Sequence, residues 1–407
     1  MSILAFLRDN APWLATGVAL TFLSSFGQTY FISVFAGEIR QVFALSHGQW
    51  GVIYSVGTAS SALAMIWAGG LTDRFRVRVL APLVLIFMSG ACLFMALNPV
   101  WWLLPVVIFS LRFTGQGMMS HIAVVAMARW FIASRGKALS VASLGNAIGE
   151  SLLPLIFASL LLVHDWRMLW GVAAGLCVCG IPVLILLLRR ERTPQSWAQS
   201  SQSLGMLARH WTRRQTLGHF LFWFMVPALL GPAAFNTAFF FHQVLIAEIK
   251  SVTHVELVAF FPLYTAGVIG SMVISGLLLD RLGTATVLPF IQVPMIAAFL
   301  FFSMAEGPLL LGLGFVLLAL TTGANSIVPN AFWAEFYGTA HIGRIKAMAV
   351  AIMVLGTAIG PAITGLAVDM GFGLEKQFVL IAGYFGFTTM MMVIGVGRAR
   401  VLLPETE

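Results

Sequence analysis

The sequence predicts an all-helical membrane protein with twelve transmembrane helices in two pseudo-symmetric bundles of six. Two observations indicate the class: of the 407 residues, 59% are hydrophobic and only 9% are charged, whereas soluble domains carry about 25% charged residues. A third observation indicates the two halves. One short polar segment, Gly69–Arg78, returns in altered form as Gly276–Gly283, each time between long apolar runs.

Twelve apolar runs are long enough to cross about 30 Å of hydrocarbon as helices. Barrel strands are excluded because they need only about 9 to 11 residues of alternating polarity, whereas these runs are longer and apolar on every face. The spans expected in the first half are Pro12–Val34, Trp50–Gly70, Val79–Leu97, Trp101–Ala126, Ala138–Val163 and Met168–Leu188. Those in the second half are Leu217–Leu245, Val255–Leu279, Val287–Met304, Leu309–Val328, Ala347–Val368 and Phe378–Val396.

The positions of lysine and arginine predict that both termini are cytoplasmic. In that orientation 18 of the 23 fall in cytoplasmic segments and four on the opposite face, as the positive-inside rule requires. The longest polar stretch, 189–216, is expected to be a cytoplasmic linker with a short interfacial helix around Met206–Trp211. The expected domains are therefore an N-terminal bundle over 1–188 and a C-terminal bundle over 217–407.

The two halves align at a nearly constant offset, which indicates an internal duplication. The separation is 207 residues from Asp73 to Asp280 and 211 residues from Gly145 to Gly356. Parallel repeats of this kind are a pattern of secondary transporters.

Over essentially its whole length the chain resembles the major facilitator superfamily. The loop signature of that family after the second span is Gly, three residues, Asp, Arg or Lys, any residue, Gly, Arg, then Arg or Lys. The first copy keeps Gly69, Asp73, Arg74 and Arg78 but has Arg76 and Val77 where the family has glycine and arginine. The second copy keeps Gly276, Asp280, Arg281 and Gly283 without the basic tail.

In the family, contacts of this loop latch the two domains together on the cytoplasmic side. The resemblance therefore implies a conformational latch made of Gly69, Asp73, Arg74, Gly276, Asp280 and Arg281. Small residues such as the glycines also let neighbouring helices approach closely. The alternative for the arginines is that they only fix the topology.

Arg112 and Glu150 are the ionisable residues expected deep in the membrane. Such residues are functional hypotheses by default, because burying a charge in hydrocarbon is unfavourable. On adjacent antiparallel helices the two would differ in depth by about 6 Å, a distance that an arginine side chain spans. We expect a buried pair near the central cavity, in which Glu150 takes a proton and releases Arg112 for an anion. The alternative is a permanent ion pair that only fixes helix packing.

Other polar residues in the spans are candidates for substrate or proton contact. Most fall on the first, fourth, seventh and tenth spans, which line the cavity in the fold that the chain resembles. For each of them, a hydrogen bond to a neighbouring helix is the alternative. They are Gln28, Tyr30, His121, Asn236, His242, Gln243, Tyr264, Asn325 and Asn330.

The resemblance implies a secondary transporter that works by alternating access, without a cofactor, in a bacterial inner membrane. Enzymatic function is not expected, since the sequence has neither a phosphate-binding loop ending in Gly-Lys-Ser/Thr nor metal-ligand spacing. The segments 128–138 and 164–167 resemble bacterial monocarboxylate and oxalate porters. A proton-coupled symporter of a small organic anion is therefore expected, as a monomer without nucleic-acid partners. The alternatives are proton-driven efflux of a drug-like molecule or metabolite, or a non-transporting sensor or partner-binding protein.

Overall fold

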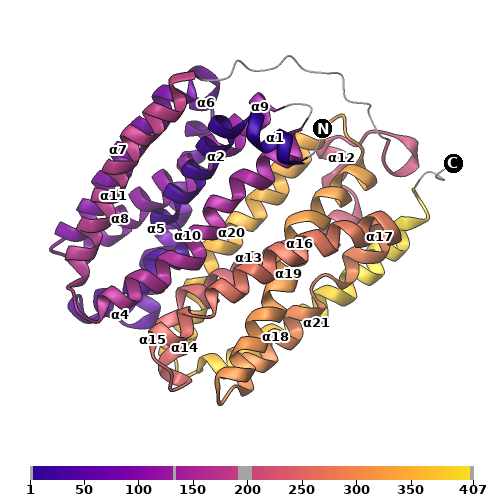
Figure 1. Cartoon of the computed structure of the whole chain (residues 1–407). Coiled ribbons are helices and arrows are strands. Elements are labelled where there is room, and N and C mark those ends of the chain that lie inside the picture. Colours follow the sequence, from indigo (N-terminus) through magenta and orange to yellow (C-terminus); the bar gives the residue numbers. More distant parts are fainter. Residues whose placement is uncertain (1–2, 132–133, 191–203, 404–407) are drawn as a thin grey trace. The chain divides into compact units, whose positions relative to one another are not determined.

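The computed structural model describes residues 3–131, 134–190 and 204–403, and every named element in these ranges is helical (Figure 1). In the same ranges, extended pairing is limited to one isolated bridge between Gly205 and Arg209. The predicted all-helical class is confirmed. By its contacts the chain forms two compact units: unit 1 is Met1–Gln199 with Phe240–Val244, and unit 2 is Ser200–Phe239 with Leu245–Glu407.

The helices before the linker are interrupted by 3-10 turns and by one π-helical segment. After α2, 3-10 turns at Ser24–Gly27 and Ser33–Phe35 flank α3, and a π-helical segment, Phe113–Met119, joins α8 to α9. The helices are α1 (Ile3–Asp9), α2 (Ala11–Leu23), α3 (Thr29–Ile32), α4 (Ala36–Val42), α5 (His47–Ala68), α6 (Leu71–Arg74), α7 (Val77–Leu97), α8 (Leu104–Arg112), α9 (Ser120–Trp130), α10 (Arg135–Leu161) and α11 (Trp166–Leu187).

After the linker the described helices are longer and less interrupted. Figure 1 shows α16 and α19 of unit 2 side by side, as their contacts require. The helices are α12 (Arg213–Leu217), α13 (Phe220–Phe241), α14 (Gln243–Ile249), α15 (His254–Val258), α16 (Phe261–Leu282), α17 (Thr284–Val287), α18 (Val293–Met304), α19 (Pro308–Tyr337), α20 (Ile342–Asp369) and α21 (Leu374–Arg400).

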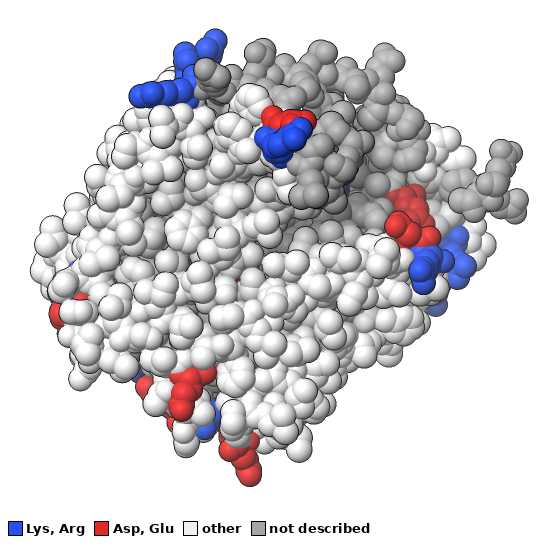
Figure 2. All heavy atoms as spheres, in the orientation of Figure 1, with Lys and Arg blue, Asp and Glu red and all other residues white. Residues whose placement is uncertain are grey.

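Ten of the described helices are long and apolar enough to cross a membrane, so the chain is a multi-pass membrane protein. An eleventh span results if Ala11–Gly27 and Thr29–Val42, bent by 45°, count as one. The fourth expected span, Trp101–Ala126, is divided into α8, the π-helical segment and α9, none of which is long enough alone. Figure 2 shows a surface composed mostly of uncharged residues on the face drawn, as lipid contact requires.

The glycines aligned by the sequence offset make the same helix crossing in each unit. In unit 1, a Cβ atom on Gly145 of α10 would lie 2.0 Å from the carbonyl oxygen of Val18 in α2. In unit 2, a Cβ atom on Gly356 of α20 would lie 2.7 Å from the carbonyl oxygen of Leu230 in α13. Only glycine permits so close an approach of two backbones. The two halves therefore share a close helix contact at an equivalent glycine as well as a constant separation in sequence.

The end of the linker packs into unit 2 and is not an interfacial helix. Only Met206–Ala208 forms a 3-10 turn, and Leu207 within it has left-handed backbone angles. The backbone N–H of Trp211 donates to the carbonyl of Tyr337 at 3.0 Å, and its indole Nε1 donates to the carbonyl of Met206 at 3.0 Å. The helix predicted at Met206–Trp211 is wrong, because the backbone N–H groups of Leu207 and Trp211 bond to Leu402 and Tyr337 instead of to carbonyls of the same segment. The Trp211 side chain is 3% exposed and belongs to the core.

Replacing Trp211 with alanine is expected to lower the free energy of unfolding by about 3–5 kcal/mol. The substitution removes a fully packed aromatic side chain and leaves a cavity. The unfolding midpoint in detergent, with the exposed Trp67→Ala as the matched control, measures the effect. A midpoint within the error of that control would show that the linker end is not part of the core.

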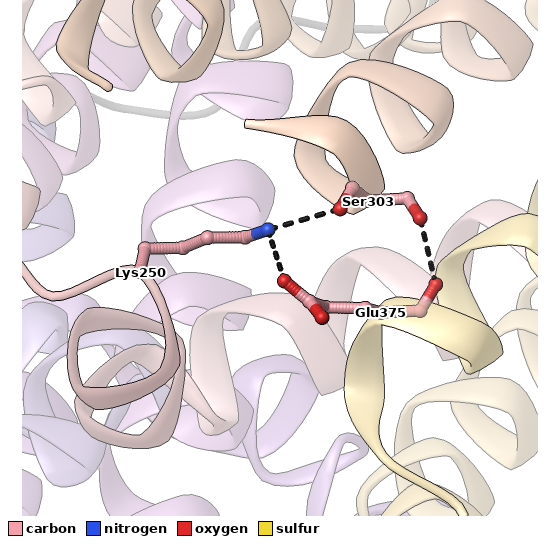
Figure 3. A network of polar contacts seen from close by, with 3 residues as sticks. All are labelled: Lys250, Ser303 and Glu375. Carbon is pink, nitrogen blue, oxygen red and sulfur yellow. Dashed lines mark hydrogen bonds and ion pairs between the residues drawn. The ribbon is translucent and has the colours of Figure 1, made fainter. Parts of the chain in front are cut away.

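A network of polar contacts joins three helical segments of unit 2 (Figure 3). The Nζ of Lys250, just after α14, donates to the carbonyl of Ser303 at 3.0 Å and pairs with Glu375 Oε1 at 2.5 Å. The Oγ of Ser303 in α18 donates to the carbonyl of Glu375 in α21 at 3.0 Å. The Lys250 side chain is 3% exposed and that of Glu375 is 51% exposed, so the lysine depends more on the pair.

The two ends of this ion pair are expected to respond unequally to substitution. Glu375→Gln should destabilise unit 2 by about 2 kcal/mol, because it leaves a buried ammonium without its counter-charge. Lys250→Met should have less than half that effect, because the half-exposed carboxylate regains water. Thermal unfolding midpoints in detergent test this order, with the exposed Lys376→Met as control. The reverse order would contradict it.

Candidate functional site

Arg112 is bound at the break in the chain that follows α2 in unit 1. The helix α2 ends at Leu23, and the 3-10 turn Ser24–Gly27 is followed by Gln28 in extended conformation. Helix ends leave carbonyl groups without intrahelical partners. The Arg112 Nη1 donates to the carbonyl of Gly27 and to the Oγ1 of Thr29, each at 3.2 Å. The guanidinium is therefore anchored at one of its nitrogens.

Close backbone contact brings Arg112 to this break. A Cβ atom on Gly27 would lie 2.1 Å from the carbonyl oxygen of Leu111, and one on Gly115 would lie 2.6 Å from the Cα of Gly27. Both positions therefore require glycine. Gly115 belongs to the π-helical segment, and such segments are frequent at functional sites.

An aromatic surface lies beside the guanidinium. The Tyr54 ring is 5.5 Å from the Arg112 Cζ, and its hydroxyl is 2.6 Å from Thr29 Oγ1. Phe241, which belongs to unit 1 by its contacts, stacks on Trp50 with ring centroids 5.8 Å apart and also contacts Tyr54. Sequence reasoning missed Tyr54 and Trp50, although their spacing of four residues places them on one face of a helix.

The remaining donors of Arg112 are buried and unpaired. The residue is 1% exposed, and neither Nε nor Nη2 has a hydrogen-bond partner. Buried polar groups of this kind are rare and call for a ligand or an ordered water. Nε–H and Nη2–H point in parallel and match the two oxygens of a carboxylate, so this edge of the guanidinium fits an organic anion.

The predicted ion pair between Arg112 and Glu150 is not formed. Arg112 Nη1 bonds to Gly27 and Thr29 instead, and its Nε and Nη2 contact no acceptor among the described residues. Depth in the membrane does not determine the rotation of a residue around its helix axis, and Arg112 points to the break after α2. Glu150 is half-buried in α10.

Tyr30 links the surroundings of the two charges. Its hydroxyl lies 2.9 Å from Ser25 Oγ and 3.2 Å from Oδ1 of Asn146, which is one helical turn before Glu150. The Tyr30 hydroxyl therefore bonds one helical turn from Glu150, and Tyr30 directly follows Thr29, which binds Arg112. Glu150, Tyr30, Arg112, Thr29 and Tyr54 are called the Arg112 group below.

Two residues predicted from the seventh span also belong to unit 1. The Gln243 side chain is 1% exposed, and its Nε2 donates to the carbonyl of Tyr30 at 3.0 Å. The ring of His242 is buried beside Phe241, with centroids 5.0 Å apart, and lies 6.3 Å from the ring of His47. Gln28 supplies the extended backbone of the break, and its side chain is half-buried.

His121 contacts the loop after the second span rather than Arg112. Its Nε2 is 3.2 Å from the carbonyl of Gly69, at the end of α5. Arg129, also in α9, donates to the carbonyl of Thr72 at 2.7 Å. Since a carbonyl accepts, His121 acts as a donor here, and the bond joins α9 to the loop.

Five of the six residues predicted to form a latch lie at helix ends. Gly69 follows α5, and Asp73 and Arg74 lie in the four-residue helix α6, with Arg74 exposed and the Asp73 side chain outside what the structure describes. In unit 2, Gly276 lies in α16, and Asp280 and Arg281 are exposed in its last turn. The latch stays a prediction.

Polar residues of unit 2 form a separate, uncharged group. Asn236 of α13 donates to the hydroxyl of Tyr264 in α16 at 3.5 Å, and that hydroxyl donates to Thr322 of α19 at 3.2 Å. Asn325 lies three residues after Thr322. Asn330 is exposed and bonded within its own helix, to the carbonyl of Ser326 at 2.9 Å, and so lies outside this group.

Metal binding has no support in the part of the chain that the structure describes. There, no three side chains of His, Cys, Asp or Glu are grouped so that they would hold a metal ion.

Comparisons with known proteins agree with the helical architecture. The family model described as Major Facilitator Superfamily matches residues 18–361. The chain is 26% identical over 379 residues to the 3-(3-hydroxy-phenyl)propionate transporter of Escherichia coli (strain K12), covering 87% of this chain and 88% of that protein.

Two solved transporters share the fold. An inward-facing, unoccupied bacterial homologue of the human lysosomal transporter Spinster matches with a TM-score of 0.75 and 15% identity, covering 98% of this chain and 99% of that one. The nucleoside transporter NupG matches with a TM-score of 0.69 and 15% identity, covering 94% and 98%.

Proposed function

Because the chain belongs to the Major Facilitator Superfamily, a family of membrane transporters rather than enzymes, we propose that it moves a small organic anion across the membrane by alternating access, coupled to protons. The observation that carries the proposal is the buried edge of Arg112, where Nε and Nη2 lack partners. A carboxylate binds this edge through two parallel hydrogen bonds. Tyr54, whose ring lies beside the guanidinium, favours a substrate with an aromatic or apolar body.

The relative from Escherichia coli supports the substrate class. Its name gives 3-(3-hydroxy-phenyl)propionate, an aromatic carboxylate, as the molecule that it transports. A carboxylate group attached to an aromatic body matches an arginine beside the ring of Tyr54. We therefore take an aromatic monocarboxylate as the first substrate to test.

Charge balance supports coupling to protons through Glu150. The residues of the Arg112 group include one positive guanidinium and one negative carboxylate, and an anion bound at Arg112 would add an excess negative charge. Such a charge is strongly unfavourable in a medium of low polarity. Protonation of Glu150 restores neutrality, so anion and proton are expected to bind together and cross in the same direction, as in a symporter.

We also propose the membrane in which the protein lies, the orientation of its termini and the parts of it that move. The excess of lysine and arginine in alternate segments favours cytoplasmic termini, and the bacterial transporters among the relatives favour a bacterial inner membrane. The two bundles, 1–188 and 217–407, would act as the moving bodies of a monomer, with 189–216 as their linker and the latch residues at their cytoplasmic ends.

Uptake into proteoliposomes tests the proposed function. The purified full chain is reconstituted and offered a panel of labelled aromatic and aliphatic monocarboxylates, with and without an inside-alkaline pH gradient. We expect saturable uptake of at least one aromatic acid, with a several-fold stimulation that a protonophore abolishes. Uptake of no carboxylate would reject the anion assignment. Saturable uptake that the pH gradient does not stimulate would reject only the coupling of transport to protons.

A further inference from the structure

One buried threonine of α5 differs from the other buried threonines of unit 1. The hydroxyls of Thr16, Thr21, Thr72 and Thr114 each donate to a backbone carbonyl three or four residues earlier, as threonines in helices commonly do. Thr58 is 2% exposed, yet its Oγ1 has no hydrogen-bond partner among the described residues. A buried hydroxyl without a partner is rare in folded proteins. The Thr58 hydroxyl is therefore available to a ligand.

Two close contacts place this threonine at the depth of Arg112. A Cβ atom on Gly57 would lie 2.7 Å from the side chain of Ile108, and one on Gly117 would lie 2.9 Å from Sδ of Met65. Helix α5 therefore runs in the same direction as α8 and the π-helical segment, and packs along both. The threonine and Arg112 both lie between these two contacts, on their respective helices.

The contact of Tyr54 with the arginine gives the direction of the threonine. Tyr54 and Thr58 are four residues apart, so their side chains lie on one face of α5. The Tyr54 ring is 5.5 Å from Arg112 Cζ, so this face is the one directed at the guanidinium. The Arg112 Cα lies about 6 Å along its helix beyond Ile108. Since long side chains of a helix point back toward its N-terminus, the guanidinium lies closer to the depth of Thr58.

A carboxylate bound at Arg112 needs more donors than the free edge of the guanidinium provides. The two oxygens of a carboxylate offer about four lone-pair sites, and Nε–H and Nη2–H of Arg112 would fill two. Lone pairs buried without a donor are unfavourable. Helices α2, α3 and α5 and the π-helical segment contain no lysine or arginine, so a further donor from these segments is uncharged. The Thr58 hydroxyl is such a donor.

We propose that the Thr58 hydroxyl donates a hydrogen bond to the carboxylate of the transported acid, next to the two bonds from Arg112. This proposal rests on the anion-transport function proposed above, and it adds a second residue that touches the substrate carboxylate. The bound carboxylate would join the second and fourth spans within unit 1. Folding does not depend on the hydroxyl, because it has no partner in the described part of the protein.

The test separates affinity from stability by comparing Thr58→Val with Thr16→Val, since valine keeps the shape of threonine but lacks the hydroxyl. Thr58→Val should weaken binding of 3-phenylpropionate by about tenfold or more, because a hydrogen bond to a charged group is lost. Its unfolding midpoint without ligand should equal or exceed that of wild type, because an unpaired buried hydroxyl is removed. Thr16→Val loses the bond to Pro12 and should show the opposite pattern, with wild-type affinity and a lower midpoint.

Titration calorimetry and thermal unfolding of the purified full chain in detergent give both quantities. Thr58→Ser keeps the hydroxyl and should bind 3-phenylpropionate as wild type does. If Thr58→Val does not fold, Thr58→Ala, which also lacks the hydroxyl, takes its place.

Wild-type affinity in the variant without the hydroxyl overturns this proposal alone. So does a Thr58→Ser protein that binds as weakly as Thr58→Val, or a loss of affinity in Thr58→Val that is accompanied by a lower midpoint. A wild-type protein that binds no carboxylate of the uptake panel overturns the anion assignment and this proposal with it.

Discussion

Arg112→Gln is expected to lower the affinity for transported carboxylates by at least about a hundredfold and to abolish their uptake. The substitution removes the charge and the parallel donors that pair with the carboxylate, and truncating one partner of a buried charged pair costs about 2–5 kcal/mol. Arg112→Lys should recover only part of the affinity, because an ammonium keeps the charge but cannot offer two parallel hydrogen bonds. Calorimetric titration and proteoliposome uptake measure both effects.

The control for this experiment is Arg398→Gln, which removes an exposed arginine from the last turn of α21. It should leave affinity and uptake unchanged. Arg112 also bonds to Gly27 and Thr29, so elution as a single species and the unfolding midpoint are compared for all variants. A folded Arg112→Gln protein that binds carboxylates with wild-type affinity would contradict the assignment of the anion site.

Glu150→Gln is expected to uncouple transport from the pH gradient. Glutamine resembles the protonated carboxyl group, so the variant should bind the anion with an affinity that no longer changes with pH. In the wild type, affinity should rise as pH falls, because protonation removes a negative charge from the Arg112 group. Exchange of labelled for unlabelled substrate should persist in the variant, while gradient-driven accumulation should be lost.

Dissociation constants across a pH series, together with uptake under an imposed gradient, measure these two properties separately. Glu306→Gln, which alters an exposed acid before α19, is the matched control and should behave as wild type. If the Glu150→Gln variant still accumulates substrate at the full rate in response to the pH gradient, Glu150 is not the residue that binds the coupled proton.

Hydropathy predicted the helices well because the bilayer requires long, uninterrupted apolar segments with internal backbone bonding. It missed the breaks that build the site. The first expected span, Pro12–Val34, bends at Gly27 and Gln28, and the fourth contains the π-helical turns after Arg112. Most residues at both breaks are as apolar or as small as those of the spans, so the mean hydropathy of the sequence gave no signal of the breaks.

The sequence indicated the two charged residues of the candidate site, but it did not indicate the groups that bind Arg112. Arg112 and Glu150 stood out because a membrane tolerates few ionisable residues. The partners of Arg112 are the carbonyl of Gly27 and the hydroxyl of Thr29, and a backbone carbonyl freed by a break has no signature in the sequence. The distance between two residues along their helices fixes depth but not direction, which is why the expected ion pair was wrong.

The glycine crossings repeated in the two units have a consequence for how such a protein can diverge. With the offset of 211 residues that relates Gly145 to Gly356, Glu150 corresponds to Pro361. The duplication therefore preserved the scaffold in both copies and the ionisable chemistry in one. On the proposed assignment of the anion site, a descendant can acquire a new substrate by substituting Arg112 and its neighbours while it keeps the glycines that pack the helices together.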